Sequence, residues 1–130
     1  MSEKPVKVPG PDHPISVTPY VGRVVGSAGG RTIADSTATL ALAEAGYPVV
    51  HYFPRADVDF PRADVDLGAL EPTDHASYCP YKGDASYFSI VVGEDVLSNA
   101  AWSYERPHAP VAQIEGHIAF YSDKVEIAER

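Results

Sequence analysis

Short apolar stretches separated by glycine and proline recur along the chain from Ile15 onward. Residues 21–25 and 31–35 flank a glycine-rich segment, which predicts two strands joined by a hairpin. Residues 49–53 and 85–92 are rich in β-branched and aromatic side chains, as strands are. Further extended segments are expected at 37–42, 76–79, 96–97, 100–104, 117–121 and 125–127. Many short strands with close turns indicate an antiparallel, mostly-β architecture, and the alternation of strands and helices typical of a doubly wound fold is missing.

The two ends of the chain complete the predicted organisation. Residues 1–14 hold four prolines and no hydrophobic period, so they are expected to form an extended N-terminal arm that lies on the surface or is partly disordered. Residues 15–130 are expected to form a single mostly-β domain, because a chain of this size buries enough apolar surface to fold alone. A brief helix is expected over 111–115, and strand 117–121 is expected to pair with 125–127.

A seven-residue sequence occurs twice in succession. Phe-Pro-Arg-Ala-Asp-Val-Asp fills residues 53–59 and again residues 60–66. Two copies are too few for a solenoid, which needs at least three units to share a core. Seven extra residues would reverse the two faces of a strand, so we expect the repeat in a proline-led helical turn or a loop. Each copy contributes one arginine, Arg55 in the first copy and Arg62 in the second.

Charge and cysteine content exclude several classes of function. Ten basic residues stand against 18 acidic ones, for a net charge of −8, and the cations are scattered. This balance repels phosphate backbones and anionic lipids, so neither nucleic acid nor a membrane is an expected partner. No stretch approaches the ~20 apolar residues that span a bilayer. The single cysteine, Cys79, excludes an intrachain disulfide and paired-thiol zinc sites and points to the cytoplasm; we expect no metal and no cofactor.

Five linked motifs carry a family resemblance. They are Tyr-Phe-Pro-Arg at 52–55, Asp-Val at 64–65 with Leu-Glu-Pro-Thr at 70–73, Cys-Pro-Tyr-Lys-Gly at 79–83 with Ala-Ser-Tyr at 85–87, Ala-Trp-Ser-Tyr at 101–104 with Pro107, and Gly-His-Ile-Ala-Phe-Tyr at 116–121. Together they resemble the bacterial and fungal domain-of-unknown-function family numbered four-two-seven. The resemblance implies a small coiled antiparallel sheet of Mss4-like or β-tent topology, with one or two short helical turns. The zinc thiols common in that topology are missing here, and the duplication leaves open whether Arg55 or Arg62 takes the family position.

The resembled family sometimes carries a nucleotidyltransferase label. Such enzymes of the polymerase-β type place a Gly-Ser turn just before an Asp-x-Asp strand, because two carboxylates must hold divalent metal against a triphosphate. Gly-Ser occurs at 26–27, and Asp-x-Asp occurs at 57–59 and 64–66. The interval between them is too long, and the second Asp-x-Asp arises only through the duplication. The residues therefore do not support this label.

The segment 79–83 holds the strongest candidates for a binding site. A cation near a thiol lowers the pKa of the thiol and favours thiolate chemistry, yet free cysteines are usually buried and inert, so we favour a structural role for Cys79 alone. Lys82 lies between Tyr81 and Tyr87 rather than on a charged face, and a binding role is favoured for it. An arginine after the Tyr-Phe-Pro strand end offers a planar fork for a carboxylate or phosphate, with a salt bridge to a neighbouring aspartate as the alternative.

Two functions remain open. The first is a small-molecule-binding domain with a polar and aromatic pocket for an anionic ligand, with catalysis left open. Its expected ligand-binding residues are Tyr52, Arg55, Arg62, Tyr81, Lys82, Tyr87, Trp102 and Tyr104, and its catalytic candidates are Cys79, Lys82 and His117. The alternative is a non-enzymatic interaction or homodimerising module that uses an exposed aromatic patch around Trp102 and Tyr104.

Overall fold

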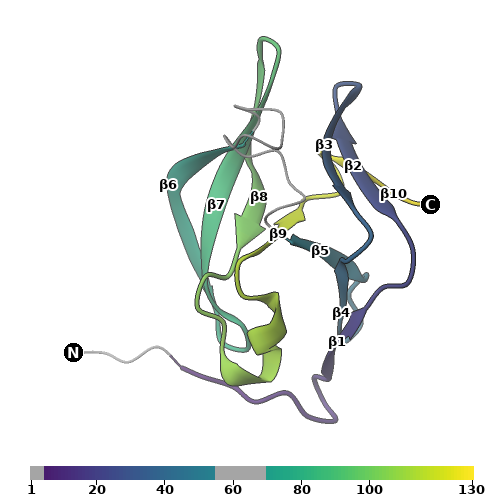
Figure 1. The fold of residues 1–130 in the computed structure, drawn as a ribbon. Helices are drawn as coiled ribbons and strands as arrows, with labels where there is room; N and C mark the ends of the chain where they lie inside the picture. The colour runs from purple at the N-terminus through teal and green to yellow at the C-terminus, as the bar shows by residue number, and fades with distance from the viewer. Residues whose placement is uncertain (1–4, 55–69) are drawn as a thin grey trace.

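The fold consists of two antiparallel sheets, in a computed structural model that describes residues 5–54 and 70–130 (Figure 1). The large sheet has seven strands in the order β1-β4-β5-β9-β8-β7-β6, and the small sheet has three in the order β10-β2-β3. The strands are β1 (Ile15–Pro19), β2 (Val24–Ala28), β3 (Arg31–Ser36), β4 (Leu40–Glu44), β5 (Val50–Pro54), β6 (Leu70–Cys79), β7 (Gly83–Val92), β8 (Asp95–Ser103), β9 (His117–Phe120) and β10 (Glu126–Glu129), with the short 3-10 helix η2 (Ala109–Ile114) between β8 and β9. The predicted mostly-β fold with a short helical segment is confirmed.

Turn residues fix two of the hairpins. β2 and β3 are joined through Gly29 and Gly30, whose φ angles of 58° and 79° favour glycine. β6 and β7 are joined through the segment 79–83, where the N–H of Lys82 donates to the carbonyl of Cys79 at 3.2 Å. A Cβ on Gly83 would lie 3.2 Å from the backbone oxygen of Arg106, so the chain passes too closely there for a side chain.

The last strand joins a different sheet from the one predicted. β9 has β5 on one side and β8 on the other, so both of its edges are filled. After β9, the N–H of Val125 donates to the carbonyl of Tyr121 at 3.0 Å in a tight turn, and β10 then pairs with β2. The predicted pairing of 117–121 with 125–127 is therefore wrong, because the turn after β9 leads the chain to the small sheet.

Alternation along the strands divides the buried side chains between two cores. Phe53 points to a cluster that also contains Val24 and Ile33 of the small sheet, whereas its neighbour Tyr52 points to a second cluster. Val111 of η2 packs into this second cluster. Figure 1 shows the small sheet opposite the part of the large sheet that holds β6, β7 and β8. The first core therefore lies between the sheets, and the second lies on the side covered by η2.

The N-terminal arm is attached to the domain at several points. The N–H of Lys7 donates to the carbonyl of Pro80 at 3.0 Å, and the hydroxyl of Tyr78 donates to the carbonyl of Pro5 at 2.6 Å. The N–H of Ala45 donates to the carbonyl of Pro14 at 2.8 Å. These bonds bring the arm beside the segment 79–83, which carries Lys82.

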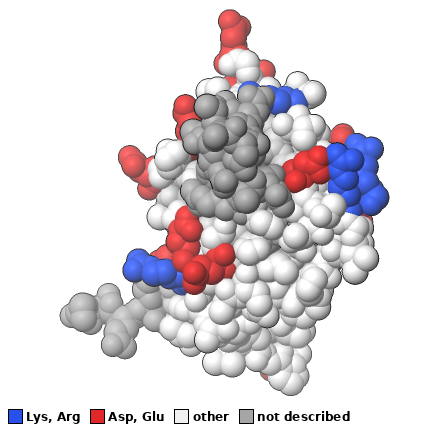
Figure 2. All heavy atoms as spheres, in the orientation of Figure 1, with Lys and Arg blue, Asp and Glu red and all other residues white. Residues whose placement is uncertain are grey.

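On the face drawn in Figure 2, the lysine and arginine side chains lie in separate small groups among acidic ones. The second heptad copy and the arginines of both copies lie outside the described residues, so the predicted turn or loop there stays a prediction. Within the described part of the chain, no helix is long and apolar enough to cross a membrane.

Candidate functional site

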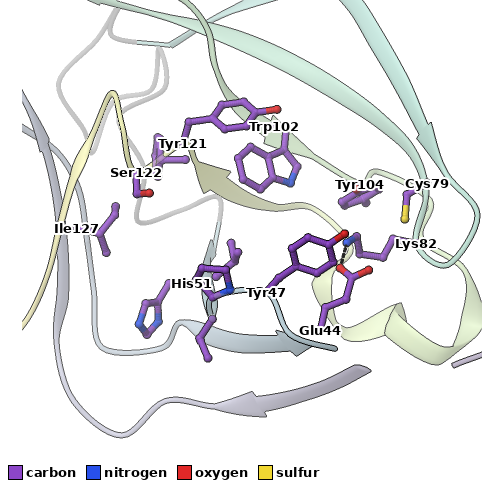
Figure 3. Close-up of a pocket in the computed structure, with 14 residues that line it drawn as sticks. Glu44, Tyr47, His51, Cys79, Lys82, Trp102, Tyr104, Tyr121, Ser122 and Ile127 are labelled. Atoms are coloured by element: carbon purple, nitrogen blue, oxygen red, sulfur yellow. Dashed lines mark hydrogen bonds and ion pairs between the residues drawn. The ribbon is translucent and has the colours of Figure 1, made fainter. Parts of the chain in front are cut away.

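A cavity of about 670 Å³ lies between the large sheet and β10 (Figure 3). Its lining is mainly apolar and aromatic, with a few polar groups at its ends. The lining residues are Glu44, Tyr47, Pro48, Val49, Val50, His51, Cys79, Lys82, Trp102, Tyr104, Phe120, Tyr121, Ser122 and Ile127. A smaller space of about 170 Å³ shares Lys82 and Trp102 with this cavity and adds Tyr52 and Tyr87. Because the two spaces share several lining residues, we describe them together as one candidate site.

Strand order in the large sheet brings these side chains together. β5, β9 and β8 are neighbours, so Val50, Phe120 and Trp102 approach the cavity from adjacent strands. Trp102 is paired across the strands with Ala119, whose small side chain leaves room for the indole on the shared face. Figure 3 shows Ile127 and Ser122 at one end of the cavity and Lys82, Glu44 and Cys79 at the other.

The polar end of the cavity holds an ion pair between Lys82 and Glu44, and Glu44 also bonds to His13. The ammonium of Lys82 bonds to Oε1 of Glu44, and Nε2 of His13 donates to Oε2 of the same carboxylate at 2.8 Å. The side chains of Lys82 and Glu44 are only 12% and 13% exposed. Burial acts to raise the pKa of Glu44, but the bonds from Lys82 and His13 outweigh it and hold the pKa below the ordinary value. Glu44 is therefore ionised at neutral pH.

The phenols around the cavity act as hydrogen-bonding groups in their neutral form. The indole N–H of Trp102 donates to the hydroxyl of Tyr52 at 3.2 Å. Burial raises the pKa of Tyr52 and of Tyr104 well above the usual range, and burial, followed by a hydrogen bond with Tyr87, raises the pKa of Tyr121 to about 12. These hydroxyls can orient a ligand, but they do not supply a phenolate at neutral pH.

His51 lines the cavity with both ring nitrogens engaged. Its Nε2 lies 2.7 Å from Oε2 of Glu129, and its Nδ1 lies 3.2 Å from the hydroxyl of Thr39. A carboxylate only accepts, so Nε2 carries the hydrogen of that bond, and the second bond joins Nδ1 to the hydroxyl of Thr39. Because Thr39 is fully buried, it does not reach a ligand. The Thr39–His51–Glu129 chain therefore ties β5 to β10.

The sequence model of a family described as a domain of unknown function (DUF427) matches residues 16–130. The chain belongs to this family. The match confirms the resemblance that the five motifs indicated. Comparison with curated proteins finds no match to the chain.

The structure brings together six of the residues predicted for a site in this DUF427 domain. Cys79, Lys82, Trp102 and Tyr104 line the main cavity, and Tyr52 and Tyr87 line the smaller space. Their roles toward a ligand stay predictions.

The other predicted residues lie elsewhere or outside the described residues. Tyr81 does not belong to the lining of the cavity or of the smaller space, and its ring stacks on His13 with ring centroids 4.0 Å apart. His117 also lies outside the cavity lining, and its Nδ1 is 3.0 Å from the carbonyl of Glu115. Arg55 and Arg62 lie outside the described residues, so the family arginine position is not placed.

Sequence reasoning missed the carboxylate and two aromatic side chains of the site. Glu44 is separated from Lys82 by 38 residues, so no local motif links them. Tyr47 stands in a Gly-Tyr-Pro segment that indicates only a chain break, and Tyr121 is the last residue of the motif at 116–121, where it was assigned only to a strand. The alternation of β4, which turns Glu44 toward the cavity, was the one signal that could have found the carboxylate. Among the described residues, no group of three or more His, Cys, Asp or Glu side chains is arranged to hold a metal ion.

Proposed function

We propose that this DUF427 domain binds a small molecule in the cavity, with an apolar or aromatic body against Trp102 and an anionic group near Lys82. The observation that carries the proposal is the cavity itself. Its volume of about 670 Å³ falls in the range of small-molecule sites, which are mostly apolar with a few placed polar groups. We further propose a cytoplasmic location, because a chain with one cysteine gains nothing from an oxidising compartment.

The mouth of the cavity supports an apolar ligand body. Tyr47, Val49 and Tyr121 are 67%, 54% and 38% exposed, and all three belong to the cavity lining. Large apolar side chains gathered in the open around one cavity are a usual sign of a binding surface. A ligand that fills the cavity would remove part of this surface from water and gain free energy from its burial.

The polar end supports an anionic group. Lys82 is the one lysine or arginine among the described residues that line the cavity. Its ammonium is already paired with Glu44, so an anion must share or displace that carboxylate. Lys82 is therefore not an open cation, and the competition with Glu44 governs how an anion binds.

Neither His51 nor the buried phenols of the cavity are available as a general base. The ring nitrogens of His51 are both engaged, and the buried phenols stay protonated at neutral pH. A general base within the cavity would need a free lone pair directed at the ligand. The interaction-module alternative relied on an exposed patch around Trp102 and Tyr104, yet Tyr104 is only 6% exposed. That burial favours the binding pocket.

Fluorescent probe binding tests the proposal. N-phenyl-1-naphthylamine is neutral and aromatic, and its fluorescence rises in apolar sites. We expect it to bind the native domain, and we expect Trp102→Ala to weaken the binding about tenfold, since a buried aromatic contact contributes on the order of 1.4 kcal/mol. Val96→Ala is the matched control, because Val96 lies on the same strand outside the cavity lining and is 59% exposed. Equal affinity in the two variants, or no binding by the native domain, overturns the proposal.

A further inference from the structure

Glu44 joins the N-terminal arm to the cavity. Its Oε1 bonds to Lys82 and its Oε2 accepts from Nε2 of His13 at 2.8 Å. Because an ionised carboxylate has no proton to give, Nε2 carries the hydrogen of this bond. Nδ1 is then the atom of His13 that takes up a second proton. We call these three residues the His13 cluster.

The charge of the His13 cluster depends on that proton. Lys82 and Glu44 together sum to zero, so the cluster is neutral with a neutral imidazole and carries one positive charge with an imidazolium. The side chains of His13, Glu44 and Lys82 are 25%, 13% and 12% exposed, so water screens these charges weakly. Histidine is the side chain whose charge ordinarily changes between pH 5 and 8. An anion entering the cavity would meet a different charge with each of the two forms of the imidazole.

The surroundings of His13 include groups of both signs. The titratable and charged groups around the imidazole, from the arm, β4 and the turn after β6, are Lys7, Asp12, Glu44, Tyr81 and Lys82. The ring of Tyr81 stacks on the imidazole with an interplanar angle of 7°, which suits a protonated ring as well as a neutral one. The Nζ of Lys7 lies 5.9 Å from the centroid of the Tyr81 ring, whereas the carboxylate of Glu44 contacts the imidazole directly at 2.8 Å.

Resting on the proposed function, we infer that the His13 cluster, and not Lys82 alone, is the anion-binding group of the cavity, and that an amphipathic monoanion binds together with one proton taken up by His13. The proton comes from solvent and goes to Nδ1. The imidazolium then holds the carboxylate of Glu44, which lets the ammonium of Lys82 turn to the ligand. The fitting ligands are aromatic carboxylates or sulfonates of a size that the cavity admits.

Two matched probes test the inference. The dye 1-anilinonaphthalene-8-sulfonate carries the ring system of N-phenyl-1-naphthylamine plus one sulfonate, so the ratio of their affinities isolates the anionic group. In the native domain we expect the affinity for the sulfonate dye, divided by that for the neutral dye, to be about tenfold higher at about pH 5.5 than at about pH 8. A tenfold change lies within the usual range of coupling between two binding events. Glu44 stays ionised across this range, because its pKa lies below the ordinary value.

Three variants separate the inference from other causes. In His13→Gln, the ratio should stay at the value that the native domain has at high pH. In Glu44→Gln, the ratio should stay at or above the value that the native domain has at low pH, because Lys82 has lost its carboxylate partner. His117→Gln is the control, since His117 lies outside the cavity lining and should leave the native pH profile in place. The inference is overturned if His13→Gln retains the native profile or if Glu44→Gln lowers the ratio. If the native domain binds the neutral probe but its affinity ratio does not change with pH, only the inference is overturned. If the native domain binds neither probe, the proposed function is overturned as well.

Discussion

Replacing Lys82 by methionine removes a charge from a weakly screened pair while keeping most of the side-chain volume. Breaking a fully buried pair costs about 3–5 kcal/mol, and breaking an exposed one costs about 0–1 kcal/mol. Side-chain exposures of 12% and 13% place this pair nearer the buried limit, and the remaining bond from His13 to Glu44 offsets part of the loss. We expect Lys82→Met to lower the free energy of unfolding by about 2 kcal/mol, which corresponds to a fall of roughly 8 °C in Tm.

A double-mutant cycle isolates the pair from the loss of the lysine itself. Glu44→Gln alone leaves an unpaired ammonium, and we expect a cost of about 1–2 kcal/mol. The double variant leaves no unpaired charge between the two positions, so its cost should be smaller than the sum by at least ~1 kcal/mol. Urea unfolding followed by circular dichroism at neutral pH measures all three. Additivity within about 0.5 kcal/mol would show that the two side chains do not stabilise each other, and the reasoning would be refuted.

Three further predictions concern stability, each measured by urea unfolding. The difference in the free energy of unfolding between the native and Glu44→Gln domains should shrink as the pH falls below 4.5, the ordinary carboxyl pKa. The pKa of Glu44 is lowered in the folded state, so its stabilising effect is present above this value and is lost when the carboxylate is protonated. A difference that stays constant would contradict this. Gly83→Ala should lower the free energy of unfolding by about 2 kcal/mol, because the φ of Gly83 is 113° and the new Cβ meets a backbone oxygen at 3.2 Å. Gly46→Ala is the control and should change the free energy little, because no atom lies within 4 Å of its new Cβ. Equal costs in the two variants would refute the argument. Ile118→Ala should cost about 3–4 kcal/mol, since Ile118 is fully buried between the sheets, and a cost below about 1 kcal/mol would mean that this core is not packed as described.

Local sequence signals predicted most of the strands but not β1 or the first part of β6, and their limits are physical. The hairpin over 26–30 and the break at 79–83 depend on glycine and proline, whose backbone preferences act at the residue itself. The pairing of 117–121 with 125–127 failed because strand partners depend on which sheet edges are free. That information lies in β5 and β8, far away in the chain.

The same limit separates the two halves of the candidate site. Lys82 and Trp102 stand in recognisable motifs, and sequence reasoning selected both. Glu44 and His13 belong to no local motif, because their part in the site depends on contacts between residues that are 31 or more positions apart. The arm was expected to lie on the surface, and the bond from its His13 to Glu44, which lines the polar end of the cavity, could be seen only in three dimensions.

Trp102 is the single tryptophan of the chain, and it stands in the wall of the cavity. Tryptophan emission, excited apart from the eight tyrosines, therefore comes from one place in the molecule. The indole N–H bonds to Tyr52, and its ring lies 4.6 Å from that of Tyr121, so a molecule entering the cavity changes the polarity and contacts of the emitting group. The protein carries its own optical reporter, and a library of unlabelled compounds can be screened for its ligand by intrinsic fluorescence alone.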